Sequence, residues 1–83
     1  MRDAASPEVI RVMQAIRGYL SLHPAAADSA RGVAQWWLPA MGIQVSDEEV
    51  GMALTRLCEE GAIGSTPLPG GDAIYWSTPP PAP

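Results

Sequence analysis

The fold is decided by residues 31–61, RGVAQWWLPAMGIQVSDEEVGMALTRLCEEG, which hold two helical patterns separated by a break. In the second half, apolar side chains recur at helical spacing, which predicts a helix with one buried face. Ser46 and Glu49 form an S-x-x-E pattern, in which each side chain satisfies a backbone N–H of the first turn. Gly61 stands where a left-handed residue ends a helix. We therefore expect a helix that begins near Asp47 and ends before Gly61.

The first half of the same stretch predicts a shorter helix. Asp28 or Ser29 can cap its first turn, and its apolar pattern extends to about Leu38. Pro39 and Gly42 are expected to end it. The residues expected on its buried face are Ala30, Val33, Ala34 and Trp37.

Upstream, residues 7–22 predict the first helix of the chain. The sequence SPE at residues 6–8 supplies a capping hydroxyl, a proline at the first helical position and an acid in the first turn. Pro24 disfavours helical geometry at His23, so the helix should end there. His23 is then expected to cap the helix or to pack on the following loop. The expected core face consists of Val9, Val12, Met13, Ile16, Tyr19 and Leu20.

Downstream of the third helical pattern, the period changes to that of strands. Residues 62–66 and 73–77 are short runs around PLPGGD, whose Pro and Gly content requires a turn, and they predict a two-stranded hairpin. Ile74 and Trp76 share one face of its second strand. Residues 43–45 alternate apolar and polar side chains, which predicts one further, very short strand.

A chain of 83 residues is expected to form one domain. A domain of this size buries only about 60% of its unfolded surface, so most apolar positions on the helices are needed for the core. We expect residues 1–5 to be flexible and residues 6–77 to fold. Residues 78–83 are mostly proline and are expected to be a disordered, extended tail.

This order of elements resembles the winged helix-turn-helix superfamily. The likeness covers residues 6–77 and rests on RGVAQWWL as second helix, SDEEVGMALTRLCEEG as third helix and AIGSTPLPGGDAIYW as the wing. It implies an α+β fold, a three-helix winged-helix domain with a C-terminal two-stranded hairpin. Many members of the superfamily insert the third helix into the major groove of DNA, whereas others mainly bind proteins. One departure is the connection at residues 39–45, which is longer than that of a tight helix-turn-helix.

Charge favours a protein partner over DNA. The chain has a net charge of −4, and the third helix sets Asp47, Glu48, Glu49, Glu59 and Glu60 against Arg56. The wing, residues 62–77, contains no Lys, Arg or His. A DNA-binding module gains most of its affinity by neutralising phosphates, which this helix would repel. The alternative is a DNA-binding regulator that uses arginines of the first two helices, alone or concentrated in a dimer; these are Arg11, Arg17 and Arg31.

We expect an adaptor or accessory subunit whose partner surface combines the outer face of the third helix, the hairpin tip and one tryptophan. The expected partner-binding residues are Trp36, Glu48, Met52, Thr55, Glu59 and Leu68. Ile10 on the first helix is a further apolar candidate. Each apolar member can instead be ordinary surface, and a chain without Phe can need all its Trp and Tyr in the core. A homo-oligomeric unit is the third alternative.

The residues that carry chemistry are few, so we expect no enzyme, no cofactor and no metal site. His23 is the only histidine, and Cys58, the only cysteine, falls on the buried face of the third helix, where a thiol behaves as a small hydrophobe. One cysteine cannot form an internal disulfide, which agrees with a cytoplasmic protein. No apolar run is long enough to predict a membrane span. The five basic residues are all Arg, which is typical of a GC-rich bacterial genome.

Overall fold

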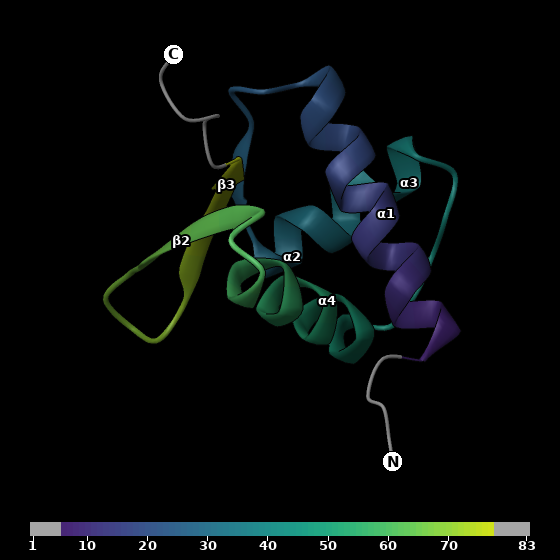
Figure 1. The fold of residues 1–83 in the computed structure, drawn as a ribbon. Coiled ribbons are helices and arrows are strands. Elements are labelled where there is room, and N and C mark those ends of the chain that lie inside the picture. Colours follow the sequence, from purple (N-terminus) through teal and green to yellow (C-terminus); the bar gives the residue numbers. More distant parts are fainter. Residues whose placement is uncertain (1–5, 78–83) are drawn as a thin grey trace.

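The computed structural model describes residues 6–77, which form an α+β arrangement of helices and a three-stranded antiparallel sheet (Figure 1). The helices pack against one another, and the β2–β3 hairpin extends to one side beside α4 (Figure 1). The expectations for residues 1–5 and 78–83 lie outside the described residues. In chain order the elements are α1 (Pro7–Leu22), β1 (Ala27–Ser29), α2 (Ala30–Gly32), the π-helical η1 (Val33–Trp37), α3 (Leu38–Ala40), α4 (Asp47–Glu59), β2 (Ile63–Pro67) and β3 (Ala73–Ser77).

Helix α1 has the predicted bounds. The Val9 N–H donates to Ser6 Oγ at 3.2 Å, so the serine caps the first turn as its position indicated. The helix ends at Leu22, and the backbone N–H of His23 donates to the carbonyl of Tyr19 at 2.8 Å. The His23 ring also lies 4.5 Å from the Tyr19 ring, centroid to centroid.

The second helical segment runs through α2, η1 and α3 and is longer than predicted. Ser29 is its cap, because Ser29 Oγ accepts a hydrogen bond from the Gly32 N–H at 3.2 Å. The predicted end at about Leu38 falls two residues short, since helical structure continues past Pro39 to Ala40. A proline ring crowds the carbonyl four residues before it in a regular α-helix. Here the chain widens into the π-helical turn immediately before Pro39, and the helix passes the proline.

Helix α4 begins and ends as predicted. The Glu49 N–H donates to Ser46 Oγ at 3.1 Å, and the Ser46 N–H donates to Glu49 Oε1 at 3.2 Å, which completes the capping box. At the other end Gly61 has a φ of 77°. Its N–H donates to the Cys58 carbonyl at 3.0 Å, and the next N–H, of Ala62, donates to the carbonyl of Leu57 at 2.9 Å. This pairing satisfies carbonyls that the last turn leaves free.

The predicted hairpin is present as β2 and β3, but the sheet has three strands, in the order β1-β3-β2, and not two. The added strand, β1, pairs antiparallel with β3, with Asp28 opposite Tyr75. Its three residues have no apolar alternation that would predict a strand. It forms because β3, already paired with β2, offers the free backbone groups of its second edge.

The very short strand predicted at residues 43–45 is also absent. These residues form an irregular connection between α3 and α4. Their alternation has a different cause, because Ile43 and Val45 are half-buried and pack against the core while Gln44 is exposed. Burial of every second residue in this connection therefore produced the apolar–polar alternation that is typical of a strand.

The core lies between α1, the η1 segment and α4, and it extends to the first residue of β2. Trp37 is only 3% exposed, and its ring stacks on Tyr19 with centroids 4.9 Å apart. Met13 and Tyr19, expected on the buried face of α1, are partly buried and pack against this core. None of the helices within residues 6–77 has the length and apolar character needed to cross a membrane. The buried core residues are Val9, Val12, Ile16, Leu20, Val33, Trp37, Leu38, Val50, Ala53, Leu54, Leu57 and Ile63.

Trp37→Ala is expected to lower the free energy of unfolding by about 3–5 kcal/mol, because it removes a buried ring and leaves a cavity against Tyr19. The neighbouring Trp36→Ala is the matched control and should change it by less than about 1 kcal/mol, since Trp36 is exposed. Urea unfolding followed by far-ultraviolet circular dichroism measures both. Equal losses for the two variants would contradict the placement of the rings.

Ser46→Ala is expected to lower the free energy of unfolding by about 1 kcal/mol, because it removes the acceptor of the Glu49 N–H at the start of α4. Ser21→Ala is the control, since Ser21 lies exposed near the end of α1 and caps no helix. Urea unfolding should show a change within about 0.5 kcal/mol for the control. An unchanged midpoint for Ser46→Ala would show that the cap does not contribute.

Candidate functional site

Four of the predicted partner-binding residues line a single open hollow between α4 and the sheet. These are Glu48, Met52, Thr55 and Glu59. The hollow has a volume of about 540 Å³, and its other lining residues are Gly51, Arg56 and Tyr75. The predicted outer face of the third helix is thus a concave surface with one wall supplied by β3.

Helix α4 gathers these four residues because they recur three or four positions apart, which places them on one face. The opposite face is committed to the core, where Val50, Ala53, Leu54 and Leu57 are buried. The helix is held in place by that buried face. Its outer side chains are therefore presented on a backbone that cannot rotate away without exposing the core.

Tyr75 completes the wall and was missed as a site residue. Successive side chains of a strand point to opposite faces, so Tyr75 lies opposite the face shared by Ile74 and Trp76. Trp76 is used within the sheet, where its Nε1 donates to Thr66 Oγ1 at 3.2 Å and its ring covers Gly64. The alternation at residues 73–77 contained the signal for Tyr75, because it already separated this residue from its neighbours.

The hollow offers an apolar side chain between acidic groups. Met52 is 46% exposed. On the same helix face, Glu48 lies one turn before it and Glu59 two turns after it. Arg56 is the only cation that lines the hollow, so its formal charge is negative. A thioether adapts its shape to what it contacts, and carboxylates at the rim favour cations opposite them. The hollow therefore suits an apolar group flanked by basic side chains.

Gly51, which lines this hollow, differs from the other glycines of the chain. All eight glycines lie within residues 6–77. Four have positive φ, and for three others an added Cβ would meet a neighbouring side chain; these are Gly42, Gly61, Gly70 and Gly71, and then Gly18, Gly32 and Gly64. Gly51 has neither reason, since no atom lies within 4 Å of the position of its missing Cβ. A glycine inside a helix is less stable than alanine by about 0.5–1 kcal/mol, and nothing in the fold requires it here.

Two predicted partner-binding residues lie apart from the hollow. Trp36, on η1, is 67% exposed and does not line it. Leu68, at the tip of the hairpin, is 39% exposed and does not line it either. The structure thus gathers the α4 residues with Tyr75 and leaves Trp36 and Leu68 at separate places on the surface.

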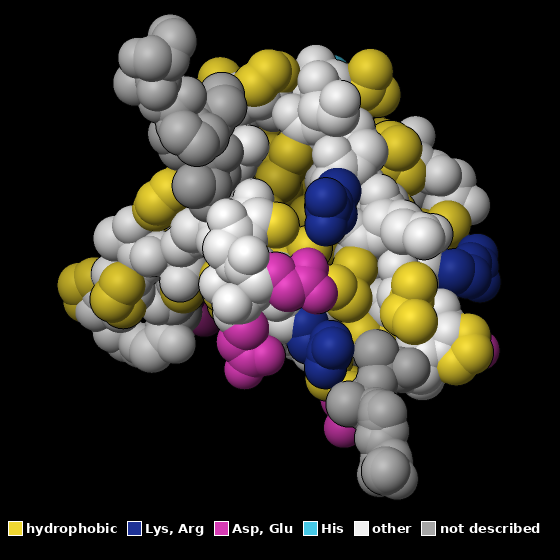
Figure 2. Space-filling model, in the orientation of Figure 1, with side chains coloured by type: hydrophobic (Ala, Val, Ile, Leu, Met, Phe, Trp, Pro, Cys, Tyr) yellow, Lys and Arg dark blue, Asp and Glu magenta, His cyan; other side chains and the backbone are white. Residues whose placement is uncertain are grey.

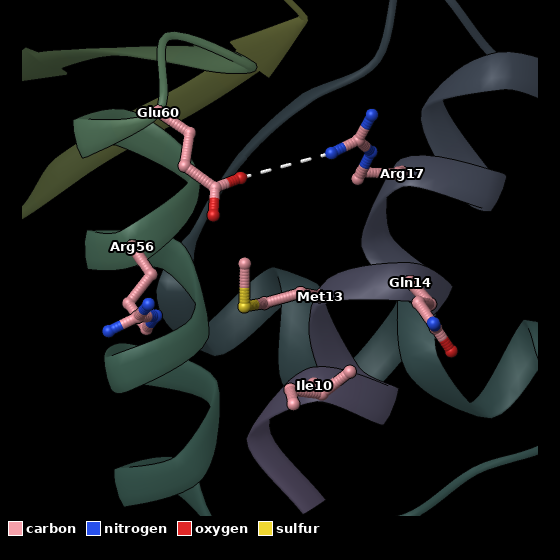
Figure 3. A pocket seen from close by; sticks show the side chains of 6 residues that line it. All are labelled: Ile10, Met13, Gln14, Arg17, Arg56 and Glu60. Carbon is pink, nitrogen blue, oxygen red and sulfur yellow. Dashed lines mark ion pairs between the residues drawn. The ribbon is translucent and has the colours of Figure 1, made fainter. Parts of the chain in front are cut away.

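A second hollow, also of about 540 Å³, lies between α1 and α4 (Figure 3). Arg17 of α1 reaches toward Glu60, the residue that follows α4, with Arg17 Nη1 and Glu60 Oε1 3.8 Å apart, and Met13 points into the space between the helices (Figure 3). Both charged side chains are largely exposed, so this ion pair contributes little to stability. The lining residues are Ile10, Met13, Gln14, Arg17, Arg56 and Glu60.

Arg56 borders both hollows. Its Nε atom is buried and has no hydrogen-bond partner in the described part of the chain. Figure 2 shows Arg side chains in dark blue next to magenta carboxylates on this side of the molecule, with yellow apolar surface between them. The lining of the α1–α4 hollow includes two arginines and one glutamate, so its formal charge is positive by one, and the Arg17–Glu60 ion pair offsets one of the two arginines.

Within residues 6–77, no group of three or more His, Cys, Asp and Glu side chains is placed to hold a metal ion. Cys58 is a free, half-buried thiol that packs against the core. His23 lies against Tyr19, which is a packing role. Comparison with protein-family models, with curated proteins and with solved structures found no match for the chain.

Gly51→Ala is expected to raise the free energy of unfolding by about 0.5–1 kcal/mol. In the folded protein the added methyl group enters open space, and in the unfolded chain alanine has fewer backbone conformations than glycine, so less entropy is lost on folding. Gly32→Ala is the contrasting variant and should destabilise the fold, since its Cβ would overlap the Asp28 carboxylate. Urea unfolding measures both. A loss of stability in Gly51→Ala would mean that this glycine serves the fold.

Proposed function

We propose that this chain is a non-enzymatic, winged-helix-like module that acts as a protein-interaction adaptor or accessory subunit, and that its partner docks in the hollow between α4 and β3. The observation that carries the proposal is Gly51, a helix-interior glycine that faces open space in this hollow. A missing side chain at that point allows another backbone to approach α4 closely. No contact within the described chain accounts for a glycine at this position, which supports a role in binding.

The order of elements supports the winged-helix part of the proposal. Three helical segments, α1, the α2-η1-α3 run and α4, precede a hairpin with glycines at its tip. The chain leaves α4 at Gly61, and the hairpin that follows extends to one side, with its tip directed away from the helices (Figure 1). In the superfamily that this order resembles, the third helix and the hairpin are the elements that meet other macromolecules.

Charge supports a protein as partner. Asp47, Glu48 and Glu59 are exposed on α4, where a nucleic-acid groove would bring phosphates against them. The hairpin supplies no cation, because residues 62–77 contain no Lys, Arg or His. A partner segment with one apolar side chain for Met52 and basic side chains for the carboxylates fits this surface. We place a DNA-binding regulator second, since it would have to use the arginines of α1 and α2.

The test is capture of proteins from the native organism on the immobilised chain and on two variants, Met52→Arg and Gly51→Leu. Both change the hollow without touching the core, because Met52 is exposed and Gly51 faces open space. Leu22→Arg is the matched control, since Leu22 is exposed at the end of α1 and lines neither hollow. A captured protein should be lost by both hollow variants and kept by the control. Calorimetry with the purified pair should then show at least about tenfold weaker binding for each hollow variant.

Two results would overturn the proposal. One is a partner that binds the hollow variants and the wild type equally. The other is retention of the wild type on duplex DNA at low salt, with log affinity falling steeply as salt rises. That result would favour the DNA-binding regulator, and loss of retention in Arg31→Ala would then locate the contact on α2.

A further inference from the structure

The hollow between α4 and β3 offers no free main-chain edge among the residues that line it. β3 is the central strand of the sheet, and Tyr75 is paired with Asp28 of β1 on one side and with Ser65 of β2 on the other. On the opposite wall, Gly51 and Thr55 lie in the interior of α4, where N–H and C=O groups bond within the helix. Both walls have therefore used their main-chain hydrogen-bonding groups.

This pairing limits the conformation of a segment that docks beside Gly51. No atom lies within 4 Å of the position of the missing Cβ, so another backbone can come close to α4 there. An extended segment in that place would bury N–H and C=O groups for which the walls have no main-chain partner, which is unfavourable. A helical segment bonds its own N–H and C=O groups and can approach without that penalty.

The charges of the hollow set a spacing for the segment. Glu48 and Glu59 are exposed at the two ends of the lining face, and a rise of about 1.5 Å per residue places them about 16 Å apart along α4. Met52 lies between them and is 46% exposed. A helix that lies along α4 covers this length in about three turns. Basic side chains at its two ends and an apolar side chain between them would match the hollow.

We infer that the occupant of the hollow is an α-helical segment of the partner protein, basic at both ends, which packs along α4 with its backbone closest at Gly51. The inference rests on the proposed function, because it specifies the segment that docks at the same site. Two helix axes come within about 8 Å only where the side chains between them are small. The partner helix therefore also has a small residue opposite Gly51.

The test is selection of peptides on the immobilised full chain from two libraries of about 15 residues, a length that spans the hollow. One library varies one face of a stable single helix, and the other varies one strand of a cyclic hairpin. Binders should come from the helix library and carry an apolar residue between two Lys or Arg about three turns apart. By calorimetry, their dissociation constants should rise at least about tenfold for Gly51→Leu and Met52→Arg. They should stay unchanged for Leu22→Arg, which is exposed outside the hollow.

Gly51→Ala tests the close approach of the two helices. The added methyl group keeps the partner backbone away from α4, so it should weaken binding of the helical peptides, though by less than Gly51→Leu does. The same variant is expected to be more stable than the wild type, so weaker binding cannot be a consequence of a damaged fold. Equal binding by Gly51→Ala and the wild type would overturn the close packing at this residue.

Charge exchange tests the two ends of the helix. A variant with both Glu48→Lys and Glu59→Lys should bind the selected peptides at least about tenfold more weakly. Replacing the two basic residues of a peptide with Glu should restore its binding to this variant. Thermal unfolding checks that each variant is folded. Binding that is unchanged in the double variant would contradict the assigned ends.

The two libraries distinguish failure of this inference from failure of the proposed function. If only the hairpin library yields peptides that lose binding to Gly51→Leu and Met52→Arg, the helical partner is wrong and the docking site stands. If neither library yields a peptide whose binding depends on these two residues, both the inference and the docking site are wrong.

Discussion

The arrangement of the whole molecule depends on the burial of Trp37 against Tyr19. These stacked rings join η1 to α1, and they fix the rotation of the helical run that contains both tryptophans. Adjacent residues of a helix point in different directions, so the orientation that buries Trp37 directs Trp36 toward solvent. The π-helical turn allows the same run to continue past Pro39 and to bury Leu38 as well. The exposed tryptophan is thus a consequence of how its neighbour is packed.

A small core also determines the surface of α4. Val50, Ala53, Leu54 and Leu57 occupy the inner face of the helix, and a chain of this size has few other apolar side chains with which to replace them. The side chains of the outer face are therefore not needed for packing, and the fold does not determine which residues stand there. The outer face holds two exposed glutamates around Met52 and a glycine without a structural neighbour. This combination is unfavourable for phosphate and for helix stability, and it is favourable for close approach by a basic protein segment.

Local signals predicted the helices and part of the site, whereas features that depend on distant pairing were missed. Ser6 and Ser46 marked helix starts because a cap is made within a few residues of chain. Strand β1 was missed because its three residues owe their conformation to the free edge of β3, far along the sequence. The effect of Pro39 on a helix predicted an end near Leu38. The π-helical turn that lets the helix continue past Pro39 is not marked by any residue type in the sequence. Tyr75 was predictable in principle, since strand alternation set it apart from Ile74 and Trp76, but its proximity to α4 required the fold.

The hollow beside α4 would select an occupant by charge. Its lining sets Glu48 and Glu59 against Arg56 around Met52, so its formal charge is negative. Basic side chains of a partner segment would gain from these carboxylates, whereas a second acidic copy of this chain would meet its own sign there. The same charges that oppose a phosphate backbone therefore also oppose self-contact through α4.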